Sequence, residues 1–457
     1  MPDPYSFFIP VVHPARHVTA LRNFHYFCRA NNQIMLSLQV IRENRQEVID
    51  RLKIKQIDAT ELVARIIRLD DVRRESQQEM DALNAQSNAL AKEIGMLFQS
   101  GKAAEANQLK EQTGKLKSQS KEAEMVMEQA TKEMEEVLVL LPNLPHASVP
   151  PGNSAEENEV VFEEGEIPVL GSEAVPHWDL VQKYRIIDFA LGNKITGAGF
   201  PVYQGKGARL QRALINFFLD QGIEAGYSEI QPPYMINAAS GFGTGQLPDK
   251  DGQMYYVSED DLYLIPTAEV PVTNLYRDVI LKPADLPVRH VAYSACFRRE
   301  AGSYGKDVRG LNRLHQFDKV EIVQITNPDH SYATLEEMRE YVTSLLRKLG
   351  LPFRIVKLCG GDISFTSAMT YDFEVYSAAQ KRWLEVSSVS NFEAFQANRM
   401  KLRIKDEMGK MIPAHTLNGS ALALPRILAA ILENNQAAGG IRIPDVLVPY
   451  TGFDLIS

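Results

Sequence analysis

Two long stretches in which apolar residues recur at alternating spacings of four and three constrain the fold more than any other feature of the sequence. A sustained heptad of this kind is typical of a coiled coil, because it keeps one seam facing a partner helix. Residues 98–102 interrupt the pattern, so we expect two arms between Glu61 and Leu141 that fold back as an antiparallel hairpin, each arm roughly 55–60 Å long. The predicted seam consists of Leu62, Ile66, Leu69, Arg73, Ser76, Met80, Leu83, Ser87, Leu90, Ile94 and Leu97 in the first arm, and of Ala106, Leu109, Thr113, Leu116, Ser120, Ala123, Met127, Ala130, Met134, Val137 and Leu141 in the second.

The far end of this hairpin is basic, although the chain as a whole is acidic. The chain has a formal net charge of −9, whereas residues 92–121 contain six lysines and three glutamates, a local charge of +3. The lysines are Lys92, Lys102, Lys110, Lys115, Lys117 and Lys121. One interpretation is an ordinary solvated helical face. The other is a contact surface for phosphate groups, whose binding would depend on salt.

The composition is that of a globular protein. Apolar residues make up 45% and charged residues 23% of 457 positions, enough for two or more domains with separate cores. The negative charge argues against indiscriminate binding to polyanions. Cys28, Cys296 and Cys359 lie far apart without metal-ligand spacing, and no apolar run approaches the roughly 20 residues that span a bilayer. We therefore expect a soluble, cytoplasmic protein without disulfides or structural zinc.

Residues 296–321 concentrate arginines, carboxylates, glycines and aromatic residues in one stretch. The segments on either side, residues 288–297 and 318–324, have the composition and alternation of strands. Between them, residues 301–306 are expected to form a loop. The pattern predicts a hairpin with polar residues near its turn.

Three arginines and one aromatic ring on this hairpin suit a nucleotide. Arg298, Arg309 and Arg313 are suited to a polyphosphate, because guanidinium groups match phosphate oxygens with paired hydrogen bonds. Phe317 offers a ring face to a base. The alternative is a hairpin laced with surface ion pairs.

The same stretch resembles a known family. Phe297-Arg-Arg-Glu300 resembles the second signature motif of class II aminoacyl-tRNA synthetases. The longer string, Cys-Phe-Arg-x-Glu-Ala-Gly from Cys296 and Arg-Gly-Leu-x-Arg-x-His-Gln-Phe-x-Lys-Val-Glu from Arg309, resembles the seryl-tRNA synthetase family. The resemblance runs from about Met35 to the end of the chain.

Two further segments resemble the other class II motifs. A helix expected at residues 210–220, a strand and Pro233 resemble the first motif, which forms a dimer interface in the family. Residues 415–426 resemble the third motif, a strand followed by a helix that carries an arginine. Ala421 and Pro425 stand where the family often has glycine, but proline is acceptable in a first helical turn.

The resemblance implies an α+β fold: an antiparallel class II sheet flanked by helices, preceded by the coiled-coil arm, in a homodimer. We expect a tRNA-binding arm domain at residues 35–145, a proline-rich and acidic linker at 146–176, and a catalytic domain at 177–457. Residues 1–34 are expected to be an extension outside the fold. An arginine-bearing, acid-poor transit peptide is the alternative.

The resemblance also implies which residues form each site. The expected serine site is Thr267, Glu269, Arg298, Glu321, Asn418 and Ser420. The expected ATP site is Arg298, Glu300, Arg313, Phe317, Glu385, Val386, Ser387, Ser388 and Arg426, with Mg²⁺ on Glu385 and Ser388. The expected tRNA contacts are the six lysines of the hairpin. From residue patterns alone, Thr267 is equally a helix cap with Glu269 in the first turn, and Glu385 an exposed strand residue.

The implied reaction has two steps: serine and ATP give seryl-adenylate and pyrophosphate, and the seryl group then passes to tRNA(Ser), with tRNA(Sec) as a further candidate. Three alternatives remain open from the residues. They are a related ligase for threonine, proline or alanine; a ligase that charges a carrier protein; and a catalytically silent paralogue that binds RNA. A coiled-coil scaffold would leave the motifs of the second domain unexplained.

Overall fold

The computed structural model describes residues 38–172, 174–249, 251–301 and 309–457. Within them, the chain forms two compact units: residues 68–137, and residues 38–67 together with 138–457. The predicted extension at residues 1–34 and most of the loop predicted at residues 301–306 lie outside the described residues. No helix of the described part combines the length and the apolar character needed to span a bilayer.

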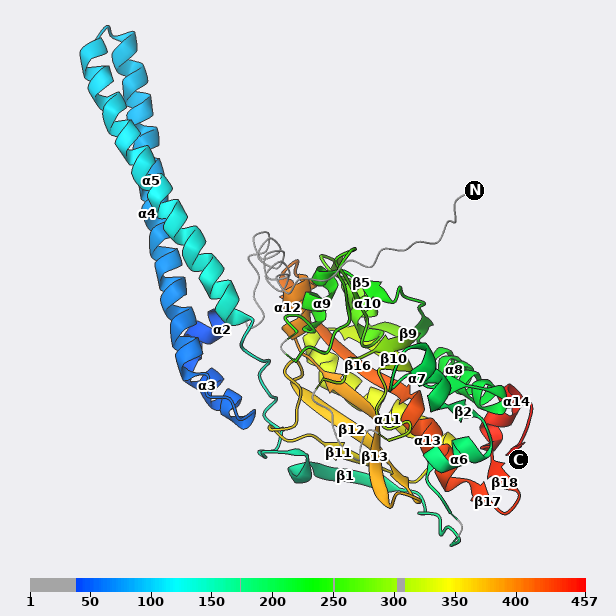
Figure 1. Cartoon of the computed structure of the whole chain (residues 1–457). Coiled ribbons are helices and arrows are strands. Elements are labelled where there is room, and N and C mark those ends of the chain that lie inside the picture. Colours follow the sequence, from blue (N-terminus) through cyan, green and yellow to red (C-terminus); the bar gives the residue numbers. More distant parts are fainter. Residues whose placement is uncertain (1–37, 173, 250, 302–308) are drawn as a thin grey trace, which may run out of the picture. The chain divides into compact units, whose positions relative to one another are not determined.

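The first unit consists of most of a helical hairpin that follows the predicted heptads. Helices α4 (Thr60–Gln99) and α5 (Ala103–Leu138) run side by side (Figure 1) and are joined by a turn in which Gly101 has a φ of 76°. Every predicted seam position is buried or half-buried, whereas most positions between them are exposed. The hydroxyl of Ser120 donates a 2.9 Å hydrogen bond to Asn84 Oδ1 on the other helix. The predicted seam is therefore confirmed except at Leu141, which lies beyond the end of α5, and the turn occupies residues 100–102 within the predicted break at 98–102.

The second unit is built on an eight-stranded sheet with the order β1-β11-β12-β13-β16-β10-β9-β4. Neighbouring strands are antiparallel, except that β4 and β9 are parallel. The predicted antiparallel sheet is confirmed, and β9 and β10 are the two strands predicted around the arginine-rich stretch. The bounds are β1 Glu159–Glu164, β4 Ser228–Glu229, β9 Val288–Phe297, β10 Gln316–Thr326, β11 Phe353–Lys357, β12 Met369–Ser377, β13 Arg382–Asn391 and β16 His415–Ala423.

Alternation along β10 separates the core from the cavity described below. Val320 and Ile322 are fully buried in the main hydrophobic core, where helices pack on the sheet. Lys319 and Glu321, which alternate with them, line the cavity instead. The helices that pack on the sheet are α8 (Gly205–Glu224), α11 (Ser331–Leu349) and α13 (Leu424–Asn434). A one-residue slip of β10 would exchange the two sets, so burial fixes its register.

Shorter elements complete this unit. The helices are α2 Leu38–Glu43, α3 Arg45–Ile54, α6 His177–Lys183, α7 Phe189–Ile195, α9 Ala238–Thr244, α10 Glu269–Asn274, α12 Phe395–Met400 and α14 Val448–Thr451. The short strands form four small sheets: β2 Ile187–Asp188 with β3 Val202–Tyr203; β5 Met235–Ile236, β6 Tyr256–Val257 and β7 Leu262–Leu264; β8 Ile280–Leu281, β14 Arg403–Lys405 and β15 Met411–Pro413; and β17 Gln436–Ala437, β18 Gly440–Arg442 and β19 Leu455–Ile456.

Two segments differ from the sequence predictions. The helix expected at residues 210–220 spans Gly205–Glu224, so it begins five residues earlier and ends four residues later than predicted. At Gly207 a Cβ atom would lie 2.2 Å from the carbonyl oxygen of Ile186, so this close contact requires glycine. Within the segment expected as a linker, residues 159–164 form β1, the edge strand paired with β11. Its acidic residues conceal the strand-forming Val-Val-Phe at its centre.

The residues that precede α4 are fastened to the sheet body. Lys55, at the end of α3, is buried and donates hydrogen bonds of 2.8 Å to the carbonyl oxygens of Ser364 and Ser367. Arg51 donates a 2.7 Å hydrogen bond to the carbonyl oxygen of Pro145. The Lys55 hydrogen bonds hold the loop at residues 364–367, part of which lines the cavity.

Candidate active site

A cavity of about 780 Å³ opens over the sheet, on the side of β10 that bears Glu321. Its wall includes every residue predicted from the resemblance for the serine and ATP sites. They come from separate elements: the turn before α10 and its first residue, the segment between β9 and β10, the strands β10, β13 and β16, and the start of α13. The sheet therefore gathers in one place residues that are far apart in the sequence.

Two arginines and one glutamate lie at the β9–β10 side of the cavity. The guanidinium group of Arg298 lies 5.1 Å from the centre of the Phe317 ring, a cation–π contact, and its Nε donates to the carbonyl oxygen of Pro266 at 3.4 Å. Arg313 forms an ion pair of 3.0 Å with Glu300. Glu300 has a φ of 48°, a conformation uncommon for residues other than glycine. The structure thus places Arg298 and Arg313 in the cavity wall. Arg309, the third arginine predicted to suit a polyphosphate, does not line the cavity, and its guanidinium lies 4.8 Å from the centre of the Trp178 ring.

Two carboxylates form the buried end of the cavity. Glu269 is 6% and Glu321 1% exposed. Burial, and then the charge of Glu321, raise the pKa of Glu269 to about 7, and a hydrogen bond from Gln396 opposes this. Thr267 joins the pair: its hydroxyl donates to Glu321 Oε2 at 3.2 Å and accepts the amide hydrogen of Glu269 at 3.2 Å. The N-cap residue of α10 is Ala268, so Thr267 lies one residue before the cap position predicted for it, although its hydroxyl accepts the first amide hydrogen of the helix and the residue lines the cavity.

One oxygen of this pair is left for a ligand. Glu321 Oε2 is ion-paired with Lys319, whereas its buried Oε1 has no hydrogen-bond partner among the described residues. Ser420 lies directly opposite Glu321 across the β10–β16 ladder, and Asn418 lies opposite Val323. A buried carboxylate oxygen without a donor is costly. The arrangement suits a small ligand that carries an ammonium group and a hydroxyl group.

A β-bulge explains why Glu385 and Ser388, three residues apart on β13, both line the cavity. The β12–β13 ladder pairs Phe373 with Ser387 but Glu374 with Glu385, so β13 has one extra residue at this point. Residues three apart on a regular strand point to opposite faces, and one extra residue brings them to the same face. Nothing in the local sequence marks this bulge.

The oxygen donors around the bulge fit a magnesium ion. Asp372 lies opposite Ser388 in the ladder, and its Oδ1 is buried without a hydrogen-bond partner among the described residues. Burial and the nearby charge of Glu385 raise the pKa of Asp372 well above its usual value. Carboxylate and hydroxyl oxygens suit Mg²⁺, which is usually held by one or two carboxylates together with substrate phosphates. The described residues contain no cluster of three or more His, Cys, Asp or Glu residues that would hold a metal alone.

Arg426 connects α13 to the cavity wall. Its Nη1 donates to the carbonyl oxygen of Glu385 at 2.6 Å and lies 3.4 Å from the Glu385 carboxylate. Its Nε donates to the carbonyl oxygen of Asn312 at 3.3 Å. Pro425 lies in the first turn of α13, as predicted, so its departure from the family pattern does not interrupt the helix.

The site also includes residues that the sequence predictions omitted. Lys319 lies two residues before Glu321 and therefore on the same face of β10, so the strand period alone was sufficient to find it. Gln396, on the short helix α12, donates to Glu269 Oε1 at 2.7 Å, and no sequence signal indicates this contact. Asp372, which lies opposite Ser388 and lines a smaller neighbouring pocket together with Glu385, was likewise hidden in an ordinary strand pattern.

The six lysines predicted to contact tRNA all lie exposed on the hairpin. Two of them are near glutamates: Lys102 lies 3.3 Å from Glu105, and Lys115 lies 3.5 Å from Glu111. Such exposed pairs contribute little to stability, so their lysines remain accessible to a polyanion.

Comparisons with known proteins identify the family of the chain. Residues 255–435 match the family model of the tRNA synthetase class II core domain (G, H, P, S and T), and residues 35–145 match that of the seryl-tRNA synthetase N-terminal domain. A serine–tRNA ligase of Salinibacter ruber is 50% identical over 421 residues, which covers 92% of this chain and 98% of the relative. The chain belongs to the seryl-tRNA synthetase family.

Solved structures of the seryl-tRNA synthetase family have the same fold. The seryl-tRNA synthetase of Pyrococcus horikoshii, solved in complex with ATP, superposes with a TM-score of 0.88 at 34% identity and covers 92% of this chain and 99% of its own. The cytoplasmic serine–tRNA ligase of Naegleria fowleri, solved with AMP, gives a TM-score of 0.83 at 26% identity, with 92% and 98% covered. The α+β fold predicted from the sequence is confirmed.

Proposed function

We propose that this chain activates L-serine with ATP and transfers the seryl group to tRNA. The observation that carries the proposal is the buried Glu269–Glu321 pair with an oxygen left unpartnered, in the same cavity as Arg298. Membership in the seryl-tRNA synthetase family supports it. The pair offers charge and hydrogen bonds to an amino acid, and the arginine offers charge to a phosphate.

Serine is the amino acid that these groups suit. Glu269 and Thr267 receive its ammonium group, and Glu321 and Ser420 receive its hydroxyl. Alanine would leave the buried polar groups unpaired, which costs roughly 10⁴–10⁵ in discrimination. Threonine carries the hydroxyl, so a steric clash with its methyl group must exclude it.

ATP and its metal occupy the rest of the cavity in this proposal. Arg298 neutralises the α-phosphate, Arg313 the outer phosphates, and Phe317 and Arg426 lie by the base. Glu300, Val386 and Ser387 complete the nucleotide site. Glu385 and Ser388 hold Mg²⁺, which supplies positive charge to the phosphates when bound.

Positioning and charge stabilisation are sufficient for the two steps. The carboxylate of serine attacks the α-phosphorus, and pyrophosphate leaves. A terminal ribose hydroxyl of tRNA then attacks the seryl carbonyl carbon, AMP leaves, and the hydroxyl proton is released. No general base or covalent nucleophile of the protein is required, because such phosphoryl chemistry depends on alignment and charge.

The remaining proposals concern partners. The hairpin lysines contact the phosphates of tRNA(Ser), and tRNA(Sec) is a second acceptor. The protein acts in the cytoplasm as a homodimer through the region of α8 and Pro233. Light scattering of the purified protein tests the dimer directly: a mass near 51.3 kDa would contradict it.

The function is tested by charging total tRNA with labelled serine, with serine-dependent pyrophosphate exchange measured in parallel. Charging with serine and not with threonine, proline or alanine is the expected result. Exchange without charging would indicate a different acceptor, such as a carrier protein. Absence of both activities would contradict the proposal and favour a catalytically silent paralogue.

A further inference from the structure

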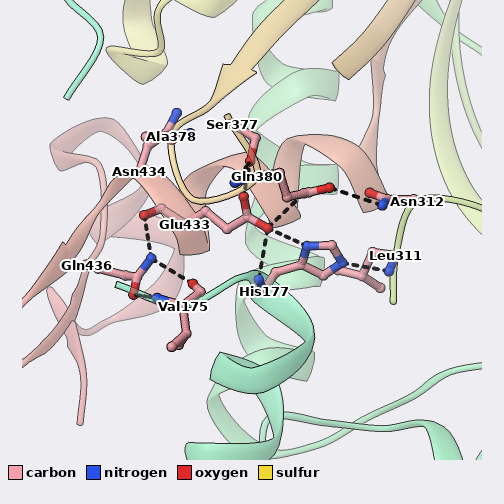
Figure 2. A network of polar contacts seen from close by, with 10 residues as sticks. All are labelled: Val175, His177, Leu311, Asn312, Ser377, Ala378, Gln380, Glu433, Asn434 and Gln436. Atoms are coloured by element: carbon pink, nitrogen blue, oxygen red, sulfur yellow. Dashed lines mark hydrogen bonds and ion pairs between the residues drawn. The ribbon is translucent and has the colours of Figure 1, made fainter. Parts of the chain in front are cut away.

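A second polar cluster lies next to the cavity without lining it. His177, the first residue of α6, and Glu433, near the end of α13, are both 0% exposed, and His177 Nδ1 lies 2.6 Å from Glu433 Oε1 (Figure 2). The same oxygen accepts the amide hydrogen of His177 at 2.8 Å and a hydrogen bond from Gln380 at 2.9 Å. Ser377 donates to the other oxygen. Glu433 is thus a buried carboxylate that is fully satisfied by donors.

These contacts fix the state of the imidazole. The backbone N–H of Leu311 donates to His177 Nε2 at 2.8 Å, so this nitrogen is the acceptor and Nδ1 carries the hydrogen that faces Glu433. Burial on its own raises the pKa of Glu433, but the hydrogen bond from His177, the charge interaction with His177 and the hydrogen bond from Ser377 together lower it. The Glu433 carboxylate therefore orients the imidazole so that its Nε2 faces the Leu311 N–H.

The imidazole holds the segment that leads to Arg313. Gly310 has a φ of 67°, and a Cβ atom there would lie 2.3 Å from His177 Nε2, so the segment and the ring are in direct contact. Asn312 is held on two further sides: its Nδ2 donates to Gln380 at 3.3 Å, and its carbonyl oxygen accepts from Arg426 at 3.3 Å.

The contacts that fix residues 310–312 thus come from three separate elements. They are α6, the turn between β12 and β13, and α13. Leu311 and Asn312 line the cavity, as does Arg313, which follows them. Two of these contacting residues, His177 and Gln380, do not line the cavity themselves, yet they help to determine where a cavity-lining segment lies.

We propose that His177 and Glu433 are positioning residues that hold residues 310–312 and thereby present Arg313 to the outer phosphates of ATP. The proposal rests on the proposed function for the identity of the nucleotide. Arg313 is assigned to the outer phosphates only. Loss of the His177–Glu433 pair is therefore expected to weaken the binding of ATP and to leave the binding of AMP nearly unchanged. A purely structural role of the pair predicts equal losses for the two nucleotides.

The experiment compares nucleotide affinities of full-length variants by calorimetry without serine or tRNA. His177→Ala is expected to weaken ATP binding by roughly 10–100-fold, the effect of a displacement near 1 Å, and to change AMP binding by less than about twofold. His177→Gln is expected to recover most of the loss, because its side-chain oxygen can accept the Leu311 N–H. Glu433→Gln keeps the shape of the side chain and one hydrogen-bond acceptor, so its affinity for ATP is expected to lie between that of His177→Ala and that of the unmodified protein.

The matched control is Gln436→Ala. Gln436 belongs to the same cluster, where it bonds Val175 and the carbonyl oxygen of Glu433, but it does not contact residues 310–313. This variant is expected to leave both nucleotide affinities unchanged. If His177→Ala does not fold, Gln380→Leu tests the same point at a half-buried position, with an expected selective loss for ATP of roughly 3–10-fold.

Equal weakening of ATP and AMP, or no change in either, would overturn the proposal. The kinetic counterpart is a rise in KM for ATP in pyrophosphate exchange with KM for serine unchanged. If the unmodified protein binds ATP but shows no serine-dependent exchange, the proposed function fails while the calorimetry still decides the role of His177.

Discussion

The helical hairpin and the sheet body bury their side chains in different ways. The hairpin has one narrow seam, which includes the polar residues Ser76, Ser87 and Thr113, and most of its surface is exposed. The sheet body has a continuous core of large apolar side chains, such as Phe218, Phe353 and Phe373. The hairpin therefore has little apolar burial per residue, and the body has much.

This difference indicates that the sheet body suits a catalytic cavity and that the hairpin suits a binding surface. The cavity needs a rigid frame, because its residues come from five or more elements between Thr267 and Arg426 and must stay aligned. A surface that contacts a long polyanion needs only exposed charge at a suitable reach. The comparison predicts that changes in the two regions affect different steps.

The largest expected effect is that of Arg298→Ala on the first step. Removing the guanidinium group takes away the charge proposed to face the α-phosphate, and we expect serine-dependent pyrophosphate exchange to fall by roughly 10³-fold. The matched control is Arg299→Ala, since Arg299 is the exposed neighbour and does not line the cavity. Near-normal exchange by Arg298→Ala would refute the role of this residue.

The next effect concerns the hairpin and the second step. Removal of residues 92–121, with the arms rejoined by a short glycine turn, is expected to leave pyrophosphate exchange intact and to lower kcat/KM for tRNA by roughly 10²-fold or more. The triple charge reversal Lys110→Glu, Lys117→Glu and Lys121→Glu should act in the same direction. It should also flatten the salt dependence of tRNA binding by about one unit for each phosphate that is no longer neutralised by a lysine.

Lys132→Glu, an exposed reversal on α5 outside the basic tip, is the control for these hairpin variants. It is expected to have a much smaller effect on tRNA charging. If the hairpin variants lost pyrophosphate exchange and tRNA charging equally, or lost no tRNA charging, the proposed assignment of the two steps to two regions would be wrong.

The helices and the seam of the hairpin were predictable because a heptad repeat indicates directly which residues are in contact. Each seam residue packs only within its own helix and against one partner helix. The strands around residues 296–321 were predictable for a similar reason, since their alternation is local. The class II motifs then located most of the cavity. Lys319 was omitted from the predicted site, although its spacing of two residues from Glu321 places both on the same face of the strand.

Other features of the site are encoded only by the assembled sheet. The bulge that brings Glu385 and Ser388 to one face depends on the pairing of β13 with β12. Gln396 reaches Glu269 across 127 positions, and His177 reaches Leu311 across 134. No local periodicity records such contacts, because they arise when separate elements pack.

A third prediction uses the pKa of Glu269, which burial and Glu321 raise to about 7. The carboxylate must be ionised to receive an ammonium group, so kcat/KM for serine is expected to fall roughly tenfold for each pH unit well below pH 7. Exchange assays from about pH 5.5 to 8.5 at saturating ATP measure this profile. Glu269→Gln should be weak throughout and lose the pH dependence. A flat profile in the unmodified protein would contradict the assignment.

The smallest effect comes from the hairpin, where burial raises the pKa of Glu135 from 4.5 to about 7 as well. Here no ligand charge compensates, so the ionised form destabilises the fold. The unfolded carboxyl ionises first as pH rises, and the stability associated with this group is greatest below about pH 4.5 and is lost by about pH 7. Because Glu135 is only half-buried, solvent screening reduces the expected gain from Glu135→Gln at pH 8 to about 1 kcal/mol.

Hydrogen exchange of α5 amides in the intact protein measures the gain, as protection roughly fivefold higher at pH 8 than in the unmodified chain and little changed at pH 5. Glu128→Gln, an exposed position on the same helix, is the control and should show neither effect. Equal protection in both variants would mean that the hairpin tolerates the buried charge. The raised pKa would then have a consequence only in the sheet body, where Glu269 is proposed to face a ligand. Glu135, on the hairpin, faces no ligand in this proposal.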